Sequence, residues 1–143
     1  MKIAIASDHA GVGYKIQLVN HLKTKGVEIK DFGPMNEESV DYPDYAHPVA
    51  NAVEKKDADI GILLCGSGNG INMSANKHQA IRSALCWKKE IAELARLHNN
   101  ANILAMPARF ISYEEAQEIV EVFLYTKFEG GRHERRVNKI ANI

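Results

Sequence analysis

Short apolar runs alternate with segments of helical period along the whole chain. The runs occupy residues 2–7, 27–32, 60–65, 80–86 and 102–105. They are too short for helices and are typical of strands buried in a parallel sheet. Because strand and helix alternate five times without an internal repeat, the pattern predicts a three-layer α/β fold. Its centre is a doubly wound, five-stranded parallel sheet with helices on both faces.

Apolar residues spaced three or four apart predict the helices between these strands. The first helix begins at Val12, ends at Gly26 and presents Val12, Ile16, Val19 and Leu22 to the core. The second begins at Asp41-Tyr42-Pro43-Asp44, with the proline in its first turn. Two later helices carry inward stripes, namely Ile91, Leu94 and Ala95 in one and Ala116, Ile119, Val120, Phe123 and Leu124 in the other. Ser112 and Glu115 are spaced as a capping box for the last of these helices.

The chain ends in a basic helix that no strand follows. Gly130-Gly131 breaks the chain before it, and Arg132 and Arg136 are four residues apart on one of its faces. Such a pair can clamp a phosphate, although a charged segment at a chain end is more often a solvated face. We expect this extra helix to dock on a neighbouring subunit.

The central strand carries the clearest candidate chemistry, because it ends on Cys65 and breaks at once into glycines. Gly66, Gly68 and Gly70 are spaced G-x-G-x-G, which is neither the dinucleotide-binding fingerprint nor a Walker loop. Backbone N–H groups of such a loop can bind a small anion at the carboxyl edge of the sheet. The alternative is that Cys65 is a small buried hydrophobic residue that closes a core strand.

Composition narrows the class of protein. A chain of 143 residues with 45% hydrophobic residues fits one domain over residues 1–143. Eighteen basic residues balance eighteen acidic ones, so neither a nucleic acid nor a membrane surface is an expected partner. The first residues do not form a signal peptide and no run is long enough to span a membrane, which favours the cytoplasm. Cys65 and Cys86 lack metal-ligand spacing and are expected to be free thiols, Cys86 as a core residue.

Several short motifs together resemble the ribose-5-phosphate isomerase B family, nearly from end to end. They are Asp8-His9, Asp41-Tyr42-Pro43, Cys65-Gly66-Ser67-Gly68-Asn69-Gly70, Ala75-Asn76-Lys77, His98-Asn99, Arg109 and the segment from Gly130 to Arg136. The resemblance implies a Rossmann-like sheet and a homodimer or dimer of dimers whose active sites are shared between subunits. It also implies interconversion of ribose 5-phosphate and ribulose 5-phosphate in the pentose phosphate pathway, through an enediolate and without metal or other cofactor.

The resemblance assigns the proton transfer to Cys65, whose thiolate the N–H groups of the loop would favour. Related enzymes that lack this cysteine carry a glutamate where this chain has Ile71. The backbone N–H groups from Gly66 to Gly70 would stabilise the enediolate oxygen. Ser67 would pass a proton between the two sugar oxygens, unless its hydroxyl only bonds its own loop.

The remaining roles concern the sugar ring and the phosphate. The resemblance places ring opening on His98 beside Asn99, although on position alone His98 reads as a partner of a helix C-terminus. Asp8 and His9 would bind sugar hydroxyls, or else Asp8 simply caps the first helix. The substrate-binding set also includes Tyr42 and Asn69, and the phosphate contacts would be Arg109, Arg132 and Arg136, with His9 and His133 as further candidates.

Three alternatives stay open at this stage. The same chemistry on a hexose 6-phosphate, such as allose or galactose 6-phosphate, fits the same fold. A non-catalytic module that binds phosphosugars would keep the cradle and the arginines. A transferase or hydrolase with a cysteine nucleophile would need a base close to Cys65, for which only His9 and His98 are candidates.

Overall fold

The computed structural model describes all 143 residues and contains a single sheet of five parallel strands. These are β1 (Lys2–Ser7), β2 (Glu28–Asp31), β3 (Ile60–Cys65), β4 (Ser83–Leu85) and β5 (Ile103–Pro107), in the order β2-β1-β3-β5-β4. All five predicted strands are confirmed, but β4 is shorter than the predicted run of residues 80–86. Side chains of Asn76 and Asn102 bond the backbone of residues 80–83 and take the place of ladder bonds there.

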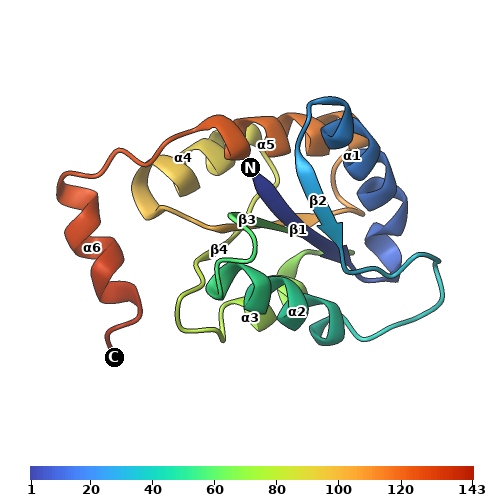
Figure 1. Cartoon of the computed structure of the whole chain (residues 1–143), viewed down its shortest axis with the longest axis horizontal. Helices are drawn as coiled ribbons and strands as arrows, with labels where there is room; N and C mark the ends of the chain where they lie inside the picture. The colour runs from blue at the N-terminus through green and yellow to red at the C-terminus, as the bar shows by residue number, and fades with distance from the viewer.

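Helices cover both faces of the sheet, as predicted (Figure 1). On one face lie α1 (Val12–Thr24), α4 (Lys89–Asn99) and α5 (Tyr113–Tyr125), which pack on one apolar cluster. On the other lie α2 (Pro43–Glu54) and the short α3 (Asn69–Ala75), which pack on a second cluster. Because the helices that follow β1 and β3, namely α1 and α3, lie on opposite faces, the carboxyl ends of these two strands border the switch point of the sheet, where ligands bind in this class of fold.

The inward faces of two helices differ from the predicted ones. The α5 stripe and its Ser112–Glu115 capping box are confirmed. In α1, however, Ile16 is 40% exposed and Lys15 is completely buried in its place. The face of α1 that buries Lys15 also buries Leu18, Val19 and Leu22. The spacing of the apolar residues alone therefore fits a face with Ile16 and a face with Lys15 equally well. In α4 the predicted inward Leu94 is 45% exposed, because the helix approaches the core with two alanines, Ala92 and Ala95.

The final helix, α6 (Arg132–Ile140), stands apart from the body at the left of Figure 1. It packs mainly on α4, with Val137 and His133 buried and Ile140 exposed. No helix of the protein is long and apolar enough to cross a membrane.

Candidate active site

Cys65 lies at the last position of β3, with only 5% of its surface exposed. The chain turns immediately after it, and the Gly68 N–H donates a hydrogen bond to Sγ over 3.1 Å. The thiol therefore lies inside the curve of the glycine loop and belongs to the apolar cluster on the face that carries α2 and α3. This confirms the predicted position of Cys65 at the carboxyl edge of the sheet.

The ionisation of Cys65 differs from the expectation that the loop favours its thiolate. Burial is the largest influence and raises the pKa of the thiol, and the nearby Asp8 carboxylate raises it further. Hydrogen bonds from the N–H groups of Ile71, Gly68 and Ser67 lower the pKa but do not outweigh burial. The net shift in the pKa of Cys65 is therefore upward, opposite to the effect of the loop N–H groups alone.

This pKa gives a prediction about pH dependence. If the thiolate is the base, kcat/KM should rise with pH, because the raised pKa keeps Cys65 protonated until the solution is alkaline. The expected slope is about tenfold per pH unit between about pH 7 and pH 9. Initial rates in buffers of constant ionic strength measure it. A flat profile over that range would mean that the thiol of Cys65 does not supply the base.

Two glycines make the shape of the loop possible. Gly68 has φ +76°, in the left-handed region, and a Cβ there would meet Leu85 Cδ1 at 2.4 Å. A Cβ on Gly70 would lie 2.4 Å from Tyr42 Cζ. The Tyr42 ring therefore packs directly on the glycine loop, from the segment that begins α2. This places Tyr42 in the candidate site, as predicted.

Arg109 reaches the same loop from the end of β5. The Ala108 N–H donates to the Cys65 carbonyl over 2.9 Å, and the Arg109 N–H donates to the Gly66 carbonyl over 3.1 Å. The guanidinium then lies over the loop, because a Cβ on Gly66 would be 3.3 Å from Arg109 Nη1. Arg109 is exposed and forms no ion pair with a carboxylate, so its donors are available to an anion.

Asp8 and His9 follow β1 and border the other side of the switch point. Asp8 is 8% exposed and accepts a hydrogen bond from the Ala10 N–H over 2.9 Å, so it caps a single 3₁₀ turn over His9–Gly11. His9 Nδ1 accepts from the Val40 N–H over 3.3 Å. The neutral His9 ring therefore carries its proton on Nε2, which leaves that N–H as a donor.

Ser67 and Asn69 form the exposed rim of the loop. The Ser67 hydroxyl oxygen accepts from the Asn69 backbone N–H and from Asn69 Nδ2, each over 3.3 Å. Both bonds leave the hydroxyl proton of Ser67 free to donate. Five parts of the predicted site thus meet at one edge of the sheet: Asp8, His9, Tyr42, Arg109 and the segment from Cys65 to Gly70, which includes Ser67 and Asn69.

The other predicted residues lie at the opposite edge of the same subunit. Helix α4 starts after the carboxyl end of β4 and runs back beside the sheet, so His98, in its last turn, lies near the amino edge. The Gly61 N–H donates to the Asn102 carbonyl over 3.0 Å, which places the segment after α4 beside the start of β3. Asn99, Arg132 and Arg136 share this end of the molecule, and Figure 1 shows α6 far from the carboxyl ends of the strands. The single chain does not bring these residues to Cys65.

His98 belongs to a small cluster between α4 and α6. Its ring stacks on that of His133, with centroids 4.2 Å apart, and His98 Nε2 lies 3.7 Å from Glu129 Oε2. Burial lowers the pKa of His133, as do the positive charges of His98 and of the two nearest arginines. Donor atoms of His98, Glu129 and His133 lie within 4.8 Å of one another, so by type and spacing the three side chains could hold a metal ion.

The arginines next to this cluster have no partner of opposite charge. Arg132 and Arg136 are exposed and pair with no carboxylate. Beside them a groove of ≈ 690 Å³ lies between the end of α6 and the turn after α3. Asn99, Lys77, Ile140 and Ile143 are among its lining residues, and it does not include Cys65. This groove is therefore next to the second group of predicted residues.

These features define a class of protein: a Rossmann-like α/β fold with a buried thiol and a ring of backbone donors at its switch point. Comparison with known proteins identifies the family. The model of the Ribose/Galactose Isomerase family matches residues 3–140, and the chain belongs to that family.

Individual relatives cover almost the whole chain. Ribose-5-phosphate isomerase B of Escherichia coli is 44% identical, over 99% of this chain and 95% of its own. A crystal structure of a ribose 5-phosphate isomerase from Thermotoga maritima is 54% identical with a TM-score of 0.97, over 99% of this chain and 98% of its own. Ribose-5-phosphate isomerase B from Mycoplasma genitalium with bound ribulose-5-phosphate is 45% identical with a TM-score of 0.95, over 99% and 94%.

Proposed function

We propose that this protein is an aldose-ketose isomerase that interconverts ribose 5-phosphate and ribulose 5-phosphate, a step of the pentose phosphate pathway. The observation that carries the proposal is the Cys65 thiol, buried at the end of β3 with the Gly68 N–H on its sulfur, in a chain of this family. The names of the relatives and the ribulose-5-phosphate bound to the Mycoplasma genitalium protein support the choice of substrate.

In the proposed reaction the Cys65 thiolate removes the proton from C2 of the open-chain aldose. The electron pair of that bond forms the C1–C2 double bond of an enediolate, and the carbonyl electrons move onto O1. Backbone N–H groups of the loop stabilise the oxygen that gains charge. Ser67, whose hydroxyl proton is free, passes a proton between O2 and O1. Return of the proton from Sγ to C1 then yields the ketose and restores the thiolate.

Ring opening must precede this step, and we propose that His98 of a second copy performs it. The support is the separation of the predicted residues into two groups at opposite edges of one subunit. A second copy, turned end to end by a two-fold axis, would bring each group to the other. The exposed Arg132 and Arg136 and the groove beside α6 suit such a contact. The protein would then work as a homodimer or a dimer of dimers with shared sites.

The phosphate would bind between subunits in this arrangement. Arg109 comes from the loop end of one copy, and Arg132 and Arg136 come from α6 of the other. All three are exposed and unpaired, and guanidinium groups bind phosphate oxygens in pairs of parallel hydrogen bonds. Binding of the substrate would thereby bridge the two copies.

A hexose 6-phosphate is the second candidate substrate, because the family name includes a galactose isomerase. The test is a comparison of kcat/KM for ribose, allose and galactose phosphates after removal of metals. We expect a preference for the pentose of at least about tenfold, since one extra carbon must fit the same pocket. A preference for either hexose would retain the chemistry and overturn the assigned substrate.

A further inference from the structure

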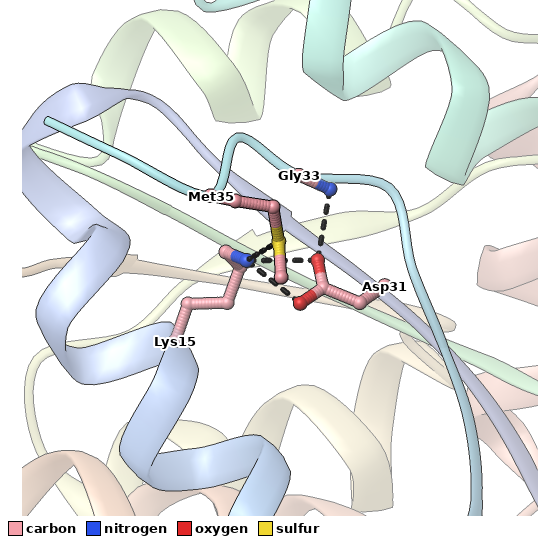
Figure 2. Close-up of polar contacts among 4 residues, drawn as sticks. All are labelled: Lys15, Asp31, Gly33 and Met35. Carbon is pink, nitrogen blue, oxygen red and sulfur yellow. Dashed lines mark hydrogen bonds and ion pairs between the residues drawn. The ribbon is translucent and has the colours of Figure 1, made fainter. Parts of the chain in front are cut away.

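One completely buried lysine takes no part in the proposed reaction. Lys15 is 0% exposed, and its Nζ donates to Asp31 Oδ1 and Oδ2 over 2.8 and 2.7 Å. A third contact joins Nζ to Met35 Sδ at 3.7 Å. A buried ammonium group is costly to leave unpaired, so Asp31 is held firmly at the end of β2. Figure 2 shows the lysine reaching from α1 to this carboxylate.

The same carboxylate holds the start of a long loop. Asp31 Oδ1 also accepts from the Gly33 N–H over 2.8 Å, on the side away from α1 (Figure 2). The Gly33 carbonyl in turn accepts from the Ser7 N–H over 3.1 Å. Ser7 precedes Asp8 at the end of β1. A chain of hydrogen bonds thus connects Lys15 to the border of the switch point.

The far end of that loop contacts the site directly. Between Gly33 and α2 the chain has no regular structure, yet two of its residues touch candidate binding groups. The Val40 N–H donates to His9 Nδ1, and the Tyr42 ring packs on Gly70. The Lys15–Asp31 pair anchors one end of the segment that orients His9 and Tyr42 at the other.

We propose that Lys15 and Asp31 are positioning residues for substrate binding: together they hold the segment from Gly33 to Tyr42 so that His9 and Tyr42 face the sugar. Neither residue is predicted to touch the substrate. This inference rests on the proposed function for its kinetic consequence. Its structural consequence, an ordered loop, is independent of the reaction.

The kinetic test replaces both charges together, because a well-packed apolar pair can substitute for a buried ion pair without loss of the fold. In Lys15→Met/Asp31→Leu we expect KM for ribose 5-phosphate to rise about tenfold while kcat stays within about twofold. The single variant Lys15→Met keeps the Asp31–Gly33 bond, so its KM should rise less. The matched control is Lys2→Met/Glu28→Leu, an exposed pair at 3.9 Å that joins β1 to β2, which should leave KM unchanged.

A second measurement does not depend on turnover. Glu37 and Glu38 are exposed in the middle of the loop, so a glutamate-specific protease reports its order. Cleavage at these two sites, identified by mass, should be about tenfold faster in the double variant, and in Lys15→Met to a lesser degree, at unchanged far-ultraviolet circular dichroism. Folded variants with unchanged KM and unchanged cleavage would overturn the proposal. If the native protein does not isomerise ribose 5-phosphate, the proposed function fails, but the cleavage rates still decide the role of the pair.

Discussion

Replacing Cys65 with alanine should lower kcat for ribose 5-phosphate by about 10³-fold and leave the fold intact, because the variant loses the group that moves the proton in the proposed reaction. The residue is small and lies at the end of a strand, so its loss removes little packing. The Gly68 N–H loses its buried acceptor, which should cost about 1 to 3 kcal/mol of stability. Steady-state rates and thermal unfolding of the same sample measure both effects.

Two further variants separate the chemistry of Cys65 from its packing. Cys65→Ser keeps a similar shape but replaces the thiol with a hydroxyl that does not ionise in the working range, so it should be nearly as inactive as the alanine variant. Cys86→Ala is the matched control. Cys86 is completely buried, and burial raises its pKa to about 12, so it is a core residue. If Cys65→Ala retains most of its kcat, Cys65 is a structural residue and the assigned mechanism is wrong.

Mixing two inactive variants should restore activity, because the candidate site is divided between opposite edges of the subunit. Cys65→Ala keeps His98, and His98→Asn keeps Cys65. In a symmetric dimer formed from one copy of each, one of the two shared sites contains both native residues. Random exchange at equal amounts should therefore recover about a quarter of native activity from two nearly inactive proteins. Subunit exchange is followed by native mass spectrometry.

The control for this experiment mixes variants from the same edge. Cys65 and Arg109 contact the same glycine loop in one subunit, so every site of a mixed dimer of Cys65→Ala and Arg109→Ala carries a defect. Its activity should not exceed that of the better parent. Failure of the first pair to recover activity, after exchange is verified, would contradict the shared site.

Much of the fold was predictable because its signals are local. Cys65 ends a continuous apolar run, and the α5 stripe keeps its period through five buried residues. The buried face of α1 was not predictable, because both Ile16 and Lys15 are at helical spacing from the apolar residues later in the helix. The pairing of Lys15 with Asp31 across 16 residues decides between them, and this contact has no local signal.

The site residues were predictable by position along the chain, but their grouping in space was not. Strand ends located Asp8, Cys65 and Arg109 at one edge. Placing His98 required knowledge of the direction in which α4 runs beside the sheet, and only the three-dimensional arrangement supplies it. The ionisation of Cys65 also escaped prediction, because backbone donors are visible in a glycine-rich sequence whereas the burial that outweighs them is not.

The central claim is tested most directly by following ribose 5-phosphate labelled with ¹³C at C1 in the presence of the purified protein after exhaustive chelation. The account predicts that the anomeric carbon signals decay and that a hydroxymethyl signal of ribulose 5-phosphate replaces them, until the two sugars reach equilibrium. An unchanged spectrum at stoichiometric protein would contradict it and would leave a hexose 6-phosphate as the remaining candidate substrate.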